Sequence, residues 1–209
     1  MKALDGVLLA NDWPADRVVD CLANKARGDI IRFLHERHEE RFFEPIRHLA
    51  SSCNKQGYGF AIMALCSLLI ETIQCYRYGL PSTNSGELER LGIPKEQWRS
   101  GSTAFNEFFL GPCQHLFPDV DAVDFYSNIR NGLLHQAQTK GGWKIRTGQA
   151  AICNLNDKII DRDKFANALE GAFQEYLEDL GQHDWAEDIW SKAAQKICWL
   201  VKTSNGARP

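Results

Sequence analysis

The stretch YGFAIMALCSLLIETIQCYRYG, residues 58–79, is the most apolar part of the chain and decides the class of fold. Its longest apolar run, Phe60 to Ile70, ends at Glu71 and is much shorter than the ~20 apolar residues that a membrane-spanning helix needs. Gly79 and Pro81 follow as typical helix stop signals. Residues 58–79 therefore predict a buried core helix, and we expect no membrane partner.

Most of the remaining chain has the three- and four-residue spacing of apolar side chains that is typical of helices. The expected helices cover residues 15–36, 120–138, 161–180 and 184–202, with shorter helical turns at 86–92 and 103–110. After Gly141-Gly142, the segments WKIR, AAIC and KIID have the composition of short strands around turns. The sequence thus predicts a mostly α fold, an up-and-down helical bundle with a small β-hairpin inserted near residues 142–160.

The length of 209 residues and the mass of 23.7 kDa suit a single domain. Within this domain we expect an N-terminal helical extension over residues 1–55, in which Pro45 breaks or kinks the second helix. A core bundle over residues 56–182 and a C-terminal helix over residues 183–209 complete the expected organisation.

The formal net charge of −3 excludes a broadly basic, histone-like nucleic-acid binder, but it leaves room for a local basic site. Residues 125–150 contain four basic and no acidic side chains, whereas residues 151–190 contain ten acidic and three basic ones. The net charge is therefore a cancellation between a basic segment and an acidic flank. The net charge therefore does not argue against a nucleic-acid ligand, and the pattern predicts local, salt-sensitive binding instead of tight non-specific coating.

The seven cysteines include no C-x-x-C pair, and several lie in apolar runs. This pattern is typical of buried free thiols in a reducing compartment and not of a disulfide framework. The first residues contain only a short apolar run after Asp5, which is too short for a signal peptide. We therefore expect a cytoplasmic protein.

Motifs of several common site classes do not occur: there is no phosphate-binding P-loop, dinucleotide fingerprint, zinc-protease motif or nucleophile elbow. His35, His38 and Glu39 could hold a metal ion from one turn of a helix. They lie in the charged run HERHEER, however, which is more typical of a solvated helix face. We expect no metal and no cofactor.

The segment FYSNIRNGLLH, residues 125–135, combines the side chains with the clearest chemical potential. Helical periodicity predicts an apolar stripe made of Tyr126, Ile129, Leu133 and Ala137. It also predicts a separate polar stripe made of Ser127, Asn131, His135 and Gln138, with Arg130 at its boundary. A guanidinium, an amide and an imidazole suit a phosphodiester, because Arg130 neutralises phosphoryl oxygens while His135 moves a proton. Gly132 within this helix indicates close approach by another segment or a ligand.

Arg130-Asn131-x-x-x-His135 also resembles the R-x(4–6)-H motif of the HEPN superfamily, in which a polar residue usually follows the arginine. The resemblance covers roughly residues 56–182. Many HEPN proteins are metal-independent endoribonucleases of toxin–antitoxin, CRISPR-associated and phage-defence systems, while others only bind RNA or partner proteins. The resemblance implies Arg130, Asn131 and His135 as catalytic residues, RNA as the substrate, a homodimer with a composite cleft, and an antitoxin or regulatory protein as a further partner.

The basic segment supplies the expected substrate-binding residues, namely Lys140, Trp143, Lys144 and Arg146. In this hypothesis the indole of Trp143 stacks an RNA base. In the alternative, residues 140–146 form an exposed hairpin whose charges keep an edge strand soluble.

Two supporting residues are expected near the motif. Ser127 lies on its predicted polar stripe, and Glu71 is the one carboxylate on the apolar helix. A buried carboxylate needs a charged partner, so Glu71 is expected to pair with Arg130 or to orient His135. Alternatively, Glu71 reaches solvent near the end of its helix.

The preferred hypothesis is a metal-independent endoribonuclease, in which the ribose 2′-OH attacks the adjacent phosphorus and leaves a 2′,3′-cyclic phosphate. The alternative is a non-catalytic module of the same fold that binds RNA or protein. A third hypothesis makes His135 the acceptor of a nucleotide transferred by a neighbouring enzyme.

Overall fold

The computed structural model describes residues 7–52 and 57–204, so the ends of the predicted extension and C-terminal helix, and Cys53, lie outside the described residues. The helical elements are α1 (Ala15–Ala23), α2 (Arg27–His38), η1 (Glu39–Phe43), α3 (Glu44–Ser51), α4 (Tyr58–Tyr78), α5 (Ser85–Arg90), η2 (Lys95–Gln97), α6 (Ser102–Phe109), η3 (Gln114–Leu116), α7 (Ala122–Asp124), η4 (Phe125–Arg130), α8 (Asn131–Gln136), α9 (Arg162–Gln182) and α10 (Asp188–Ser204). The strands are β1 (Leu8–Ala10), β2 (Trp13–Pro14), β3 (Lys144–Arg146), β4 (Cys153–Asn154) and β5 (Ile159–Asp161).

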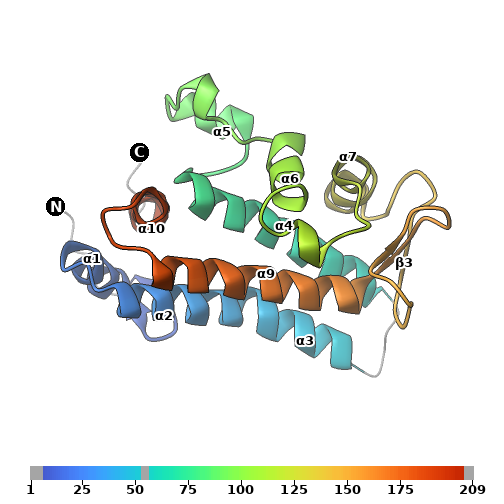
Figure 1. The fold of residues 1–209 in the computed structure, drawn as a ribbon, viewed down its shortest axis with the longest axis horizontal. Coiled ribbons are helices and arrows are strands. Elements are labelled where there is room, and N and C mark those ends of the chain that lie inside the picture. The colour runs from blue at the N-terminus through green and yellow to red at the C-terminus, as the bar shows by residue number, and fades with distance from the viewer. Residues whose placement is uncertain (1–6, 53–56, 205–209) are drawn as a thin grey trace.

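The prediction of a mostly helical bundle with a small sheet is confirmed. In Figure 1, α2, η1 and α3 form one long rod that runs beside α9. The helix α4 packs against α3, α9 and α10, and it also contacts α6 and α8. The sheet that contains β3 lies at one end of the bundle, and α1 and α10 lie at the other end (Figure 1).

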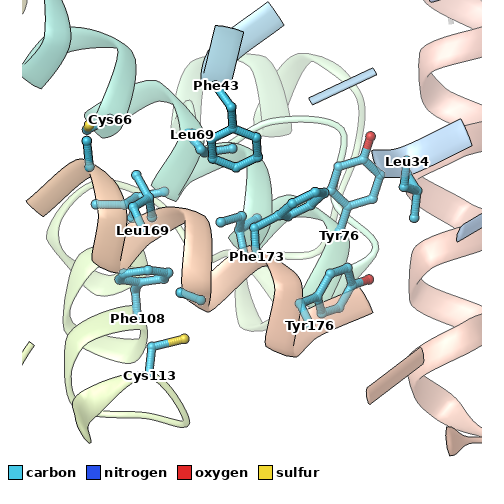
Figure 2. Close-up of a cluster of buried hydrophobic side chains, with 14 of the residues drawn as sticks. Leu34, Phe43, Cys66, Leu69, Tyr76, Phe108, Cys113, Leu169, Phe173 and Tyr176 are labelled. Atoms are coloured by element: carbon cyan, nitrogen blue, oxygen red, sulfur yellow. The ribbon is translucent and has the colours of Figure 1, made fainter. Parts of the chain in front are cut away.

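The helix α4 is the core helix that its sequence predicts. Within the described residues it alone is long and apolar enough to cross a membrane, but more than half of that stretch is buried inside the bundle. Figure 2 shows Leu69 and Tyr76 of α4 beside Phe43 of η1 and Phe173 of α9. The helix ends where Gly79 adopts the left-handed conformation, with φ 68°, as expected from the sequence.

Several side chains of residues 7–51, within the expected N-terminal extension, contribute to the main core. Phe33 and Leu34 of α2 are buried in the same apolar cluster as the side chains of α4 and α9. The strands β1 and β2, which the sequence did not predict, pair antiparallel just before α1. The N-terminal part of the chain is therefore a layer of the bundle.

The prediction of a solvated helix face around HERHEER is wrong for His38. This side chain is buried, and its ring centroid lies 4.3 Å from that of Phe173. Its Nδ1–H donates to the Leu34 carbonyl oxygen at 2.7 Å. Burial lowers the pKa of His38 to about 3, because the charged imidazolium loses its hydration in the core. His38 is therefore a neutral core residue.

The chain stays helical across Pro45, but only through a widened turn. Proline lacks the N–H that would bond the Arg41 carbonyl, and its ring collides with that carbonyl in a regular α-helix. The π-helical turn η1 comes immediately before α3, and Pro45 lies in the first turn of α3. The wider π-helical turn accommodates the proline ring and its missing N–H, so that α2, η1 and α3 continue as one rod.

The strands β4 and β5 form the predicted antiparallel hairpin, and β3 adds a parallel strand on the other edge of β5. The strand β5 leads directly into α9. Its last residue, Asp161, caps α9 by accepting hydrogen bonds from the backbone N–H groups of Asp163 at 3.0 Å and Lys164 at 2.9 Å. Arg146 of β3 pairs in register with Asp161, so basic side chains of β3 lie beside the start of α9.

Candidate functional site

The predicted motif helix is present as α7, η4 and α8, but it is shorter and differently wound than expected. It begins at Asp121, whose side chain accepts a hydrogen bond from the Asp124 N–H at 2.7 Å. It ends at Gln136, because Ala137 adopts the left-handed conformation with φ 54°. Ala137 is exposed and is not part of the apolar stripe, and Gln138 lies outside the helix. The π-helical turn η4 rotates the buried face, so that Phe125 lies in the core.

Gly132 permits a close approach, as the sequence predicts, and the approaching segment is the chain itself. A Cβ atom at this position would meet the backbone of Gln138, and it would lie 3.2 Å from Thr139 Cα and Lys140 N. The backbone N–H of Lys140 donates to the Asn128 carbonyl oxygen at 2.8 Å. The loop after α8 therefore folds back onto its own helix.

Arg130 is held by two neighbours. Its Nε donates to one carboxylate oxygen of Glu71 at 2.8 Å, and its Nη2 lies 2.7 Å from the same oxygen as part of the ion pair. Its Nη1 donates to Asn131 Oδ1 at 2.9 Å. The Arg130 side chain is 18% exposed and that of Glu71 is 17% exposed. The expected ion pair between α4 and the motif helix is therefore present.

Glu71 is itself fixed by a second contact. The hydroxyl of Thr83, a buried residue in the segment after α4, donates a hydrogen bond to the other carboxylate oxygen of Glu71. Three parts of the chain thus determine the position of the Arg130 guanidinium. Two of its five N–H groups have no acceptor among the described residues, and these are available to a bound anion.

His135 lies in the last turn of α8 and is exposed. Asn131 lies four residues before it, so the two side chains share one face of α8. Arg130, at the junction of η4 and α8, connects this face to Glu71. The structure therefore presents an accessible imidazole, an amide and a positioned guanidinium on one short helical segment.

Ser127 does not belong to this group. It lines a shallow hollow of about 410 Å³ at the start of the motif helix, with Asp121, Val123, Asp124, Asn128 and Leu155 as the other lining residues. Neither Arg130 nor His135 reaches this hollow. The continuous polar stripe predicted from regular helical periodicity is interrupted, because η4 changes the rotation per residue.

Trp143 is the clearest correction among the predicted substrate-binding residues. Its side chain is buried, with 5% exposed, and its indole N–H donates to Asp124 Oδ2 at 3.0 Å. Trp143 therefore packs mainly in the core, although it also lines the cavity at the N-terminal end of α4. Lys140, also predicted to bind substrate, is half-buried in the loop that returns over Gly132.

Lys144 and Arg146 are exposed on β3 and line a cavity of about 420 Å³ at the N-terminal end of α4. Phe60 and Arg162, for which the sequence predicted no role, are among the other side chains that line it. Glycines at positions 57 and 59 are the only sequence signal for this cavity, since they indicate close backbone approach. The predicted basic segment is therefore divided between the motif helix and this cavity.

The described cysteines do not offer an alternative nucleophile in the core. All six are free. Burial raises the pKa of Cys75 to about 11 and that of Cys153 to about 12, and it raises the pKa of Cys66 further. These thiols are protonated at neutral pH, and a protonated thiol is a poor nucleophile.

Comparison of the chain with known proteins identifies no family and no function for this site. No family model matches the chain, and no curated protein and no solved structure matches it significantly.

Proposed function

We propose that this protein is a HEPN-like, metal-independent endoribonuclease, with Arg130, Asn131 and His135 as its catalytic residues. The observation that carries this proposal is the position of Arg130, which Glu71 and Asn131 hold on the same short helix that exposes His135. A guanidinium fixed in this way is preorganised to stabilise the negative charge of a phosphorane-like transition state.

In the proposed reaction a base removes the proton of a ribose 2′-OH, and the resulting oxygen attacks the adjacent phosphorus. The bond from phosphorus to the 5′-oxygen breaks, and an acid returns a proton to that oxygen. The products are a 2′,3′-cyclic phosphate and a 5′-OH. His135 serves as base or acid, while the two remaining N–H groups of Arg130 bind phosphoryl oxygens.

The proposed active form is a homodimer. The reaction needs two proton transfers, and each chain contributes one imidazole from the motif. A second His135 across a two-fold axis supplies the other group, and a C2 interface places identical segments opposite one another. This arrangement agrees with the resemblance of the Arg130-to-His135 segment to the HEPN motif.

One observation favours a second candidate, a non-catalytic HEPN-like module that binds RNA or protein. Nε and Nη1 of Arg130 already donate to Glu71 and Asn131, its Nη2 is ion-paired with Glu71, and its side chain is mostly buried. An arginine that only joins two helices makes the same contacts. In this candidate His135 has no role in chemistry.

The resemblance also places the proposed activity in a toxin or phage-defence effector, with an antitoxin or regulatory protein as its partner. The free thiols suit the reducing cytoplasm, where RNA substrates are available. These partners and this location are part of the proposal.

The experiment that separates the two candidates is incubation of the purified chain with total RNA in the presence of EDTA. RNA cleavage that persists in EDTA supports the endoribonuclease. RNA binding without cleavage, measured on the same preparation by gel shift, supports the binding module and overturns the catalytic proposal.

A further inference from the structure

The cavity at the N-terminal end of α4 has the features of a built anion site. It has a volume of about 420 Å³, within the range of pockets that hold small ligands. It lies between the first turn of α4, the strand β3 and the start of α9. Figure 1 shows this meeting point at the end of the bundle that carries the sheet.

Arg162 is the central cation of this cavity. It is the first residue of α9, and its side chain is only 5% exposed although it lines the cavity. Its Nε donates to Asp163 Oδ1 at 3.2 Å, while Nη1 and Nη2 have no acceptor within residues 7–52 and 57–204. A buried guanidinium with open N–H groups is a strong donor to a phosphate or carboxylate, because its desolvation has already occurred.

The first turn of α4 adds backbone donors beside this guanidinium. The N-cap of α4 is Gly57, which has no side chain that could accept from the N–H groups of the first turn; among these, the Phe60 N–H donates to the Gly57 carbonyl oxygen at 3.1 Å. A Cβ atom at Gly59 would lie 2.9 Å from Ile145 Cγ2 and 3.5 Å from Arg162 Nη1. The glycine therefore brings the positive end of a long helix into contact with the buried arginine, and both attract an anion.

The rim of the cavity supplies further charge and an aromatic surface. Lys144 and Arg146 line it from β3 and are exposed. The carboxylate of Asp163 accepts hydrogen bonds from Arg162 and from the Thr147 hydroxyl. Because this one carboxylate is outnumbered by the basic side chains, the rim has an excess of positive charge. Phe60 is 40% exposed on the same rim, which is unusual for a side chain of this size and apolarity.

We propose that this cavity binds a nucleotide phosphate, with Arg162 and the first turn of α4 holding the phosphate and Phe60 stacking on the base. Lys144 and Arg146 add electrostatic attraction at the rim. The chemistry is shared by a free nucleotide and by one nucleotide of an RNA strand, because both present a phosphate next to a base.

The cavity is separate from the Arg130 motif. Gly59 and Glu71 are twelve positions apart on α4, which corresponds to about 18 Å along the helix. The phosphate site therefore does not require the proposed cleavage to exist. If RNA is the ligand, the cavity holds a nucleotide several positions away from the bond near His135.

The test is isothermal titration of the full chain with inorganic phosphate, AMP and the non-cleavable deoxyadenosine tetranucleotide. We expect AMP to bind more tightly than phosphate. Arg162→Met should weaken the binding of both by roughly tenfold or more, because charge-assisted hydrogen bonds are lost. Phe60→Ala should weaken AMP binding by roughly tenfold and leave phosphate binding unchanged, because only the base loses its stacking partner.

Lys164→Ala is the matched control, since it removes an exposed charge two residues from Arg162 that does not line the cavity. It should leave all three affinities unchanged. The double variant Lys144→Ala/Arg146→Ala, at exposed positions, should weaken AMP binding even if Arg162→Met proves unstable. Tighter binding of the tetranucleotide than of AMP assigns the site to a strand, and equal binding assigns it to a free nucleotide.

The proposal is overturned if the unmodified chain binds neither phosphate nor AMP. It is also overturned if Arg162→Met and the double variant Lys144→Ala/Arg146→Ala bind as tightly as Lys164→Ala. A chain that binds AMP but cleaves no RNA separates this site from the proposed nuclease. A chain that cleaves RNA but binds neither probe contradicts the phosphate site alone.

Discussion

Arg130 forms an ion pair with Glu71, in which Nε donates a hydrogen bond to one carboxylate oxygen at 2.8 Å and Nη2 lies 2.7 Å from the same oxygen. The two residues lie on different helices and are separated by 59 positions in the chain. Their pairing therefore joins the core helix α4 to the motif helix. It also fixes the group that would contact phosphate in the proposed reaction.

The first prediction concerns this ion pair. Glu71→Gln should lower the free energy of unfolding by about 2 kcal/mol, because it leaves the mostly buried Arg130 charge without its counter-ion. Arg130→Met should have a similar cost, since it strands the carboxylate. Urea denaturation of both variants and of the double variant measures their coupling, which should be about 1–3 kcal/mol.

Glu89→Gln is the control for that series, because Glu89 is exposed on α5. Its unfolding free energy should stay within about 0.5 kcal/mol of the unmodified chain. Additive effects of Glu71→Gln and Arg130→Met, with no coupling, are the result that would speak against a structural ion pair.

The second prediction concerns the stability of the fold in mild acid. His38 is neutral in the folded core, with a pKa of about 3, whereas the unfolded chain protonates it near pH 6.5. The unfolded state therefore binds more protons below pH 6.5, and the His38 contribution to stability falls as the pH decreases toward 3. We expect a loss of about 2 kcal/mol between pH 7 and pH 5 from this group.

Urea denaturation at pH 5, 6 and 7 measures that loss, with His38→Phe as the reference. Phenylalanine keeps the aromatic contact with Phe173 but cannot titrate, so the variant should lose less stability between pH 7 and pH 5. Equal pH dependence of the two proteins would rule out a buried neutral His38.

The third prediction concerns two glycines that lie in helices. Gly132→Ala should destabilise the chain by about 1–3 kcal/mol, because the new Cβ collides with the backbone of Gln138. Gly28→Ala in α2 meets no atom within 4 Å and should stabilise the chain by about 0.5–1 kcal/mol. Thermal unfolding of both variants tests the fold-back of the loop after α8, and a stabilising Gly132→Ala would contradict it.

Local sequence signals predicted the main elements well. The apolar run of α4 with its stop at Gly79, and the helix that starts near Asp161, both depend on residues close together in the chain. The pairing of Glu71 with Arg130 was also predictable, because a carboxylate on an apolar helix needs a cation. The antiparallel hairpin of β4 and β5 follows from the same local information.

Features that depend on distant contacts were not predictable in this way. The π-helical turn η4 changes which side chains of the motif helix are buried, and regular periodicity cannot reveal such a turn. Trp143 is buried with its N–H bonded to Asp124, and Arg162 is buried beside Gly59 of α4; both contacts join residues far apart in the chain. A basic or aromatic residue in a short strand-like segment looks exposed until the tertiary contacts are known.

The most direct test of the proposed ribonuclease site compares cleavage of a defined RNA in EDTA by the unmodified chain and by His135→Ala. Gln136→Ala, at the exposed neighbouring position, is the control. We expect products that end in 2′,3′-cyclic phosphate and 5′-OH, and no cleavage of the same strand made with 2′-deoxyribose. The cleavage rate of His135→Ala should be lower by roughly 10²–10⁴-fold. Both variants should unfold like the unmodified chain, because both positions are exposed. An unchanged rate for His135→Ala, or no cleavage by the unmodified chain, would contradict the assignment of this segment as a ribonuclease site.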